Sequence, residues 1–327
     1  MINRRSFLGS ASVLAIAASL PSFALANDPA KGRLVFGIPP GAVGNQLADT
    51  TLNILASQFN TNYRLDIIDA RNTLQASETV KLAPPDGATL LQTQCASMVL
   101  FPHLYRSLAY DPLKDFTPLA LMGDYSFALT VGPVVPANIT TVDQYLLWVK
   151  ANPEFRDIGF SVYGSQSHLI GMMIGRSKEI AVRPQSYRSV KAMMGDLHSG
   201  AVAAAITVAG NTVIAAIPGV RALAVTGRER LTGWPTVPTF AEAGVPDLEL
   251  QGWYAWFAPA NLPDATSRQW RDKLSAVQAT AAYGDAQKRL LLHQVSLSPE
   301  QIQNRMRTEM ASYAKLVDSY GLTPITT

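Results

Sequence analysis

The sequence predicts an α/β protein with two lobes, each built from mixed, mainly parallel strands covered by helices. Strand-like apolar runs alternate with segments of helical periodicity along the chain. An early strand–loop–helix unit occurs near the start of the chain and again in its middle. The length agrees with this organisation, since 327 residues correspond to about two domains.

The first part of the chain predicts a β-α-β-α-β series. The expected strands are residues 33–38, 64–68 and 89–93, and the expected helices are one starting at Asn45 and one over 74–82. Asn45 has a side chain suited to an N-cap. This alternation is typical of a parallel sheet with covering helices.

The middle of the chain repeats the alternation, and the end is helical. The expected strands are 127–131, 158–161, 202–208 and 222–226, and the expected helices are 142–151, one opening after Gly164, and 190–198. Helices are then expected over 265–279 and from Ser298-Pro299-Glu300-Gln301, a capping box with Pro at the first helical position.

Residues 1–26 have the pattern of an export signal peptide. Arg4 and Arg5 precede a short apolar run that ends at Ala24-Leu25-Ala26. The apolar run is shorter than the ~20 residues that span a membrane. The paired arginines resemble a twin-arginine signal, while an ordinary secretory signal remains the alternative. We therefore expect an exported protein without a membrane span.

Composition and motifs argue against catalysis and nucleic-acid binding. The 27 basic and 24 acidic residues form no concentrated basic run. A nucleophile elbow, a P-loop, a dinucleotide fingerprint and a His-Glu-x-x-His motif are all missing from the sequence. The single cysteine, Cys95, permits neither an intrachain disulfide nor a cysteine metal site and is expected to be a buried thiol. We expect no cofactor, no metal and no nucleic-acid partner.

Ser165 and His168 are the one pair that suggests a hydrolase. They lie three residues apart at the expected start of a helix. No carboxylate is nearby to orient the histidine, which a serine–histidine pair needs for efficient catalysis. A polar cap beside a histidine is the competing interpretation.

Two strand-to-helix loops carry more information. The first runs from Pro39 to Asn45, and the second from Tyr163 to His168. Small residues leave backbone N–H groups accessible, and a helix N-terminus adds a partial positive charge of roughly +0.5. Such loops bind anions readily. Ordinary strand-to-helix turns are the alternative interpretation.

The sequence resembles the Bug-type solute-binding receptors of tripartite tricarboxylate transporters from about Arg33 to the C-terminus. The resemblance rests on the order and spacing of several motifs, the most specific being the last long one. These are Pro40-Gly41-Ala42-Val43-Gly44-Asn45, Pro85-Asp86-Gly87, Pro102-His103-Leu104-Tyr105, Tyr110-Asp111-Pro112-Leu113-Lys114-Asp115-Phe116, Gly164-Ser165 with His168-Leu169, and Leu223-Ala224-Val225-Thr226 followed by Pro235-Thr236-Val237-Pro238-Thr239-Phe240-Ala241-Glu242-Ala243-Gly244.

This resemblance implies a periplasmic binding protein of the venus-flytrap type, with a ligand cleft between its lobes. Lobe 1 would comprise residues 27–124 and 225–327, and lobe 2 residues 125–224. The implied function is capture of a small organic carboxylate for membrane transporter subunits, by a monomer without catalysis. A ligand-sensing subunit of a signalling receptor is the alternative, and a periplasmic hydrolase using Ser165 and His168 is the third.

The resemblance also implies a set of ligand contacts, in which loop amides, hydroxyls and waters, rather than a dedicated arginine, hold the ligand carboxylates. In lobe 1 these are Gly41, Ala42, Val43, Gly44, Asn45 and Ser97. In lobe 2 they are Gly164, Ser165, Gln166, His168 and Tyr187.

The sequence departs from the family pattern at positions that bear on the ligand. Asn45 stands where the family has Asp, which argues against amino-acid ligands. Residues 70–75 replace a glycine-rich loop with bulkier side chains, and Ala203 replaces an Asp. Arg71 and Arg188 are further candidates for the cleft, with surface or structural roles as the alternative.

Overall fold

The computed structural model describes residues 31–246, 248–322 and 324–326. The predicted signal peptide, residues 1–26, lies outside these ranges. Within them, no helix combines the length and the apolar character needed to cross a membrane.

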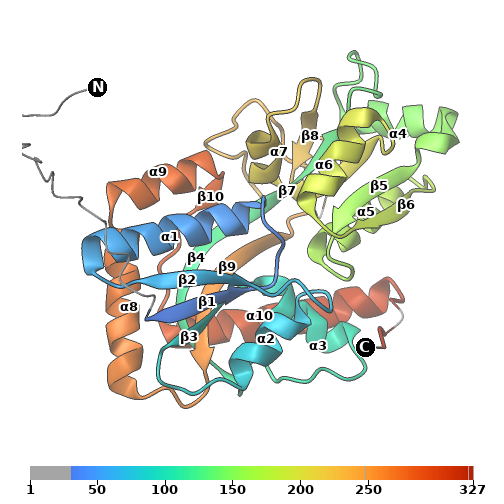
Figure 1. The fold of residues 1–327 in the computed structure, drawn as a ribbon. Helices are drawn as coiled ribbons and strands as arrows, with labels where there is room; N and C mark the ends of the chain where they lie inside the picture. The colour runs from blue at the N-terminus through green and yellow to red at the C-terminus, as the bar shows by residue number, and fades with distance from the viewer. Residues whose placement is uncertain (1–30, 247, 323, 327) are drawn as a thin grey trace, which may run out of the picture.

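Lobe 1 contains the predicted β-α-β-α-β series and the C-terminal helices. Its strands are β1 (Gly32–Phe36), β2 (Tyr63–Ile67), β3 (Thr89–Gln94), β9 (Gln251–Pro259) and β10 (Leu292–His293). Its helices are α1 (Val43–Phe59), α2 (Leu74–Lys81), a π-helical turn (Ala96–Leu100), α3 (Phe101–Leu104), α8 (Asp264–Gln278), α9 (Ala281–Arg289) and α10 (Pro299–Ser319). In Figure 1, α1 and α9 lie on one side of the sheet, and α10 and α3 lie on the other.

Lobe 2 repeats the alternation on a smaller scale. Its strands are β5 (Asp157–Ser161), β6 (Arg183–Tyr187), β7 (Ala204–Val208) and β8 (Arg221–Val225). Its helices are α4 (Val142–Ala151), a 3-10 turn (Pro153–Phe155), α5 (Gln166–Ser177), α6 (Val190–Ser199) and α7 (Ala209–Ala215).

One long strand joins the two lobes. Strand β4 (Phe116–Val131) pairs with β9 as far as Ser126, and with β7 and β8 from Phe127 or Ala128 onward. The strand order is β2-β1-β3-β9-β4-β7-β5-β6, with β8 and β10 also paired to β4. Strands β1, β2 and β3 are parallel to one another, as are β5, β6 and β7, whereas β4 and β9 are antiparallel to their neighbours. The sheet is mixed, as predicted (Figure 1).

Most predicted elements are confirmed to within two residues at each end. The capping box at Ser298 is also confirmed, because Ser298 Oγ accepts a hydrogen bond from the Gln301 amide and Gln301 Oε1 accepts one from the Ser298 amide. Strand β4 starts at Phe116 rather than at residue 127. Strands β6, β9 and β10 and helices α3, α7 and α9 were missed. Strand β9 is buried at every residue after Gln251, so its sequence lacks the alternation that identifies a half-exposed strand.

The aromatic residues of β9 form the centre of the lobe 1 core. Trp253, Tyr254 and Trp256 are fully buried. The Trp256 indole donates to Gln92 Oε1 on β3 at 2.9 Å, and the Tyr254 ring lies 4.7 Å from that of Tyr125 on β4. Burial of these large rings contributes much of the hydrophobic stabilisation, and the indole hydrogen bond satisfies a buried donor.

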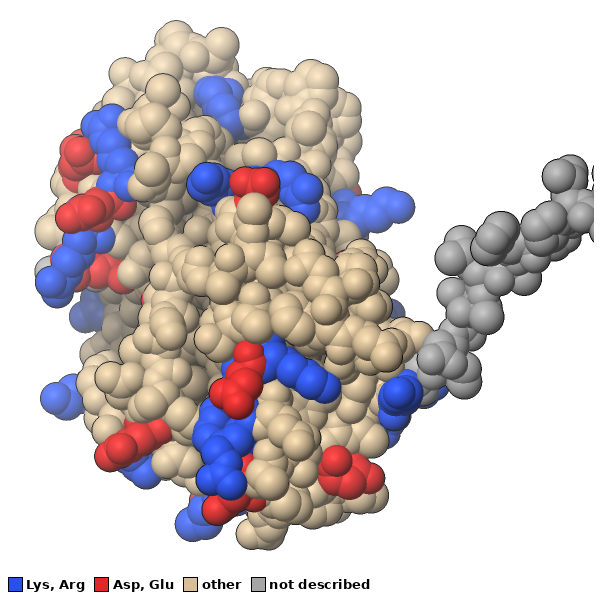
Figure 2. All heavy atoms as spheres, turned by 90° about the vertical axis from the view of Figure 1, so that its left-hand side faces the viewer, with Lys and Arg blue, Asp and Glu red and all other residues tan. Residues whose placement is uncertain are grey.

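The surface carries both signs of charge. On the face shown in Figure 2, basic and acidic side chains lie beside one another, and neither gathers into a broad patch. Ion pairs such as Arg183–Asp157 and Arg230–Glu242 bring opposite charges together at the surface. Exposed pairs of this kind typically contribute less than about 1 kcal/mol each.

A partly buried charge network fastens α10 to β4 close to the point where the strand passes into lobe 2. Arg305 on α10 donates to both carboxylate oxygens of Asp124 at 2.9 Å and to Glu309 Oε1 at 2.7 Å. Glu309 Oε2 accepts from the Trp253 indole at 2.8 Å. Burial raises the pKa of both Asp124 and Glu309, and the Arg305 charge opposes that rise. The two carboxylates therefore depend on Arg305 to remain ionised.

Replacing Arg305 with methionine should destabilise the protein by roughly 2–4 kcal/mol at pH 8, because two partly buried carboxylates lose their counter-charge. A carboxyl group whose pKa is higher in the folded protein than in the unfolded chain favours folding when it takes up a proton. The loss should therefore be smaller at pH 5 than at pH 8. Urea unfolding of the wild type and the variant at the two pH values measures both effects.

Arg307→Met is the matched control, because Arg307 is exposed on the same helix and its guanidinium donates hydrogen bonds to Asn304 and Gln303 and forms no ion pair with another described residue. It should change the unfolding free energy by less than about 0.5 kcal/mol. Equal losses in the two variants would contradict the role assigned to Arg305.

Candidate functional site

A cavity of about 390 Å³ lies between the two lobes. Its walls come from the end of β6 and from the loops that follow β1 and β2 in lobe 1 and β5 and β6 in lobe 2. The lining residues are 37–39, 69–73, 162–163 and 186–188. Ligands of open α/β folds bind outside the carboxyl ends of parallel strands, and this cavity has that position. Its volume falls within the usual range for small-molecule sites.

The two lobes are hydrogen-bonded to each other around this cavity. Asn72 Nδ2 donates to the Tyr163 carbonyl oxygen at 2.7 Å and to the Tyr105 hydroxyl at 2.7 Å. Nearby, the Val43 amide donates to Asn211 Oδ1 at 2.9 Å. The Gln166 amide group contacts the Cys95 sulfur. The structure is therefore a form in which the lobes are closed against each other.

The loops that line the cavity hold unusual backbone conformations. Arg71, Asn72 and Thr73 have φ values of 52°, 56° and 73°, and Val162 across the cavity has φ of 65°. Left-handed conformations are uncommon outside glycine and costly for a β-branched residue. The Thr73 hydroxyl lies 3.0 Å from that of Ser97, and this contact fixes the first loop to the π-helical turn. Ser97, a predicted ligand contact, thus supports the cavity wall in this form.

The first predicted loop, Gly41 to Asn45, forms the start of α1. The prediction that Asn45 is the N-cap is wrong, since Ala42 occupies that position and Asn45 is the third residue of the helix. Asn45 Oδ1 accepts from the Ala42 amide, and its Nδ2 donates to the Ile38 carbonyl oxygen, both at 3.0 Å. Asn45 is buried, so both ends of its amide are used by backbone next to the helix.

The remaining residues of that loop differ in exposure. Gly41 is exposed and has φ of 102°, a conformation that glycine adopts easily. Ala42, Val43 and Gly44 are buried. The first helical N–H group, that of Val43, is occupied by Asn211 of lobe 2. In the closed form the Asn211 side-chain oxygen therefore occupies the position at the start of α1 where an anion would bind.

The second predicted loop, Gly164 to His168, forms the start of α5. Ser165 is the N-cap residue, yet its side chain accepts no capping hydrogen bond from a backbone N–H of the first turn. Its hydroxyl donates to the Ser161 carbonyl oxygen at 3.1 Å and lies 2.7 Å from the Ser167 hydroxyl. Gly164 has φ of 75°, and a Cβ there would lie 2.8 Å from the Leu104 side chain of lobe 1. The loop is thus shaped for close approach of the lobes.

Gln166 and Cys95 meet in the buried interior between the lobes. Both are buried, and burial raises the pKa of the Cys95 thiol to about 12. The thiol is therefore neutral and unreactive at physiological pH. This confirms the expectation of a buried, inert cysteine.

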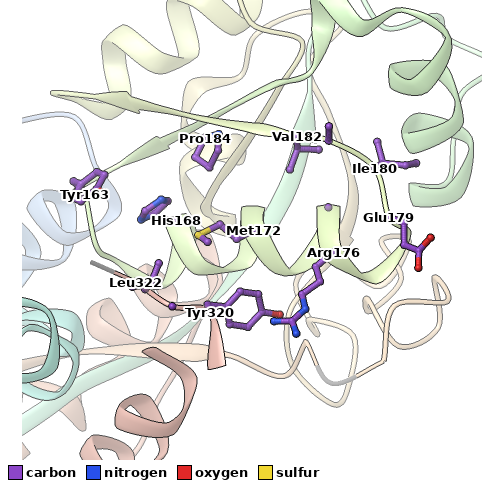
Figure 3. A pocket seen from close by; sticks show the side chains of 13 residues that line it. Tyr163, His168, Met172, Arg176, Glu179, Ile180, Val182, Pro184, Tyr320 and Leu322 are labelled. Atoms are coloured by element: carbon purple, nitrogen blue, oxygen red, sulfur yellow. The ribbon is translucent and has the colours of Figure 1, made fainter. Parts of the chain in front are cut away.

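His168 faces a second cavity. Its ring stacks on Phe160 at 4.6 Å and lies 4.8 Å from the Tyr163 ring. The cavity beside it has a volume of about 670 Å³ and is also lined by Met172, Arg176 and Tyr320 (Figure 3). Burial lowers the pKa of His168, so its ring is neutral near pH 7. Among the described residues, His168 Nδ1 has no hydrogen-bond partner.

Tyr187 is the predicted contact that lines the cavity between the lobes. Its hydroxyl donates to Asp196 Oδ2 at 3.0 Å. Burial and the Asp196 charge raise the pKa of Tyr187 to about 12, so it remains a neutral hydroxyl.

Three charged side chains also line that cavity. Arg71 and Arg188 were considered from the sequence as cleft residues, whereas Asp69 was missed. Arg71 pairs with Glu78 at 2.6 Å. A signal for Asp69 was available, because it lies two residues after β2 ends, at the carboxyl edge where the other loops meet.

Comparison with known proteins agrees with this architecture. The family described as tripartite tricarboxylate transporter family receptor matches residues 67–322. BugT of Bordetella pertussis is 26% identical over 233 residues, 69% of this chain and 70% of BugT. A UPF0065 protein of Pseudomonas sp. (strain P51) is 25% identical over 294 residues, 88% of this chain and 85% of the relative.

Solved structures show the same fold. Rpa4515 of R. palustris, solved with adipate, aligns with a TM-score of 0.85 and 23% identity, covering 90% of this chain and 98% of Rpa4515. MatC of Rhodopseudomonas palustris, solved with bound malate, aligns with a TM-score of 0.80 and 21% identity, covering 88% of this chain and 98% of MatC. The family match spans well over half of the sequence. This chain therefore belongs to the receptor family of the tripartite tricarboxylate transporters.

Proposed function

We propose that this protein is a solute-binding receptor that captures a small organic carboxylate between its two lobes. The observation that carries the proposal is the cavity at the carboxyl ends of β1, β2, β5 and β6, lined by an arginine from each lobe. Guanidinium groups bind carboxylates through paired, charge-assisted hydrogen bonds. The structures of relatives with adipate and malate support the same class of ligand.

The ligand contacts implied by the family resemblance remain part of this proposal. Tyr187 is proposed to contact the ligand in the closed form. The helix starts at Gly41–Asn45 and Gly164–His168, together with Ser97, are proposed to form the walls that a ligand meets as the lobes come together. Opening the lobes would release the Val43 amide from Asn211 and the Gln166 side chain from Cys95, which makes those groups available to an entering ligand.

The cellular role follows from the same family. We propose that residues 1–26 direct export to the periplasm, that residues 27–124 with 225–327 and residues 125–224 move as separate lobes, and that a monomer delivers the ligand to membrane transporter subunits. A sensing subunit with the same fold would bind the ligand in the same way. Co-purification with membrane transporter subunits distinguishes transport from sensing.

Catalysis is not part of the proposed function. The hydrolase alternative needs the Ser165 hydroxyl to be activated by His168. Instead, that hydroxyl bonds to Ser161 and Ser167, and the His168 ring stacks on Phe160 and lies tilted against Tyr163. A binding role fits these contacts better.

A thermal-shift screen tests the proposed function directly. A carboxylate present at 100 times its dissociation constant should stabilise the protein by about 2.7 kcal/mol, because it binds only the folded state. For a protein of this size that corresponds to a rise in Tm of roughly 5 °C. The panel should contain C3–C6 mono- and dicarboxylates, hydroxy acids, aromatic acids and amino acids, with chloride and sulfate at equal ionic strength as controls. A panel in which no carboxylate exceeds the salt controls would refute the proposal.

Asn72→Gly should shift the protein toward an open form. The change removes the hydrogen bond to the Tyr163 carbonyl while glycine still accepts the left-handed backbone at this position. The radius of gyration of the ligand-free protein, measured by small-angle X-ray scattering, should increase. Ligand affinity should fall roughly threefold to tenfold, since a smaller fraction of molecules is closed.

Asn60→Gly provides the control for this experiment. Asn60 also has a left-handed backbone, but it ends α1 within lobe 1. It should leave both the radius of gyration and the affinity unchanged. The same radius for all three proteins would show that the Asn72 bond does not hold the lobes together.

A further inference from the structure

Helix α1 has no side-chain cap of its own and is capped by the other lobe. Its N-cap residue is Ala42, whose methyl group cannot accept a hydrogen bond from the first turn. The first helical N–H group, that of Val43, donates instead to Asn211 Oδ1 of lobe 2 at 2.9 Å. Nearby side chains or water normally satisfy the free N–H groups at a helix start. In the closed form, the Val43 group depends on Asn211.

Asn211 is held in a fixed position within lobe 2. Its side chain is buried, and its Nδ2 donates to Thr207 Oγ1 at 2.9 Å. The hydroxyl of the next residue, Thr212, lies 2.8 Å from that of Thr130 on β4 and fixes α7 to the sheet. Both ends of the Asn211 amide are therefore paired, one within its own lobe and one across to lobe 1.

Gly210 allows α7 to come this close to lobe 1. A Cβ at Gly210 would collide with the Leu290 carbonyl oxygen and would lie 2.8 Å from the Val43 side chain, both in lobe 1. In Figure 1, α7 lies next to the start of α1. The start of α7 is thus fitted against lobe 1, and only glycine leaves room for the contact while the lobes touch.

We propose that Asn211 stabilises the closed arrangement of the lobes by capping α1 from lobe 2. When the lobes separate, water can satisfy the Val43 N–H group, whereas in the closed form Val43 is fully buried and only Asn211 pairs with it. Neither residue lines the cavity between the lobes, so a bound ligand and this bond favour the same closed form. The inference rests on the proposed function and assigns a side chain that regulates closure of its site.

Cys95 provides a readout of opening that needs no ligand. It is the single cysteine of the chain, it is fully buried, and the Gln166 side chain of lobe 2 contacts its sulfur. Opening withdraws Gln166, so the rate at which iodoacetamide alkylates the thiol follows the open fraction. Asn211→Leu leaves the Val43 amide buried and unpaired in the closed form, and it should raise this rate about tenfold.

Gly210→Ala should open the lobes by a different route. Alanine favours a helix more than glycine does, so lobe 2 keeps its fold, while the added methyl group collides with lobe 1 in the closed form. The alkylation rate should rise in this variant too. Gly195→Ala on α6 is the matched control, because a Cβ at that position enters open space, and it should leave the rate unchanged.

Thr130→Val and Asn211→Asp are the controls for Asn211→Leu. Thr130→Val removes the hydroxyl contact that holds α7 within lobe 2 but keeps the bond to α1, so the rate should stay at the wild-type value. Asn211→Asp keeps an acceptor oxygen for the Val43 amide and should also remain slow. Small-angle X-ray scattering should show a larger radius of gyration only for Asn211→Leu and Gly210→Ala.

Two results with the ligand-free protein would overturn the inference. Wild-type rates in both Asn211→Leu and Gly210→Ala would mean that the bond belongs to the crossing of β4 and persists when the lobes open. An equal rise in Thr130→Val and Asn211→Leu would mean that both changes loosen lobe 2 and that the cap has no role of its own.

Ligand binding separates this inference from the proposed function. For the best carboxylate of the thermal-shift screen, Asn211→Leu should weaken binding, by a factor no larger than the rise in alkylation rate. Tighter binding would overturn the inference and leave carboxylate capture intact, because the ligand would then replace Asn211 at the Val43 amide. Binding of no carboxylate at all would refute the proposed function, while the alkylation rates still decide whether Asn211 holds the lobes closed.

Discussion

Strand β4 runs without interruption from lobe 1 into lobe 2, and the arrangement of both lobes depends on this continuity. Its first part pairs with β9, and its last part with β7 and β8. The register between β4 and β9 shifts near Pro118 and again near Gly123, where φ is 147°. Such irregularities bend a strand and increase its twist. The bend lies just before the strand changes partners, so it helps to set how the second lobe is oriented over the first.

The charge network of Arg305 lies beside this bend. Asp124 on β4, Glu309 on α10 and Trp253 on β9 are joined through it and through the Trp253 indole. The network thus fastens three elements of lobe 1 on the near side of the crossing. On the far side of the crossing, the lobes also meet around the cavity, through hydrogen bonds such as the one from Asn72 to Tyr163 and through apolar contacts such as Leu104 against Gly164. Domain closure around a ligand forms and breaks contacts of this kind while the chain bends at a few residues.

The sequence predicts the fold well wherever local signals agree with tertiary structure. The capping box at Ser298 marks the start of α10 because its signals are local. Strand β9 could not be identified in this way, since its burial on both faces removes the period of two. Asn45 illustrates the same limit for the site. Its residue type suits the N-cap position, but in the structure Asn45 is the third helical residue and its side chain accepts a hydrogen bond from the backbone of the N-cap residue, Ala42. Which of the two positions Asn45 takes depends on the backbone conformation of Ala42.

The cavity lining could be predicted only in part. The loops after β1 and β5 were identified from their small residues, yet the cavity in the closed form is lined more by the loops after β2 and β6. The difference arises because a side chain of the opposite lobe can occupy a helix start that the sequence predicts as an anion site. Asn211, for example, accepts the hydrogen bond of the first N–H group of α1. Which loop remains open to a ligand is a property of how the lobes meet, and a single sequence does not specify that geometry.

A crystal structure of the protein with its most stabilising carboxylate shows whether the ligand binds between the lobes. Ligand density is expected in the cavity bounded by residues 69–73 and 186–188, with a carboxylate within hydrogen-bond distance of the Arg188 guanidinium. Density in the neighbouring cavity beside His168 and Arg176, with the first cavity empty, would rule this binding site out.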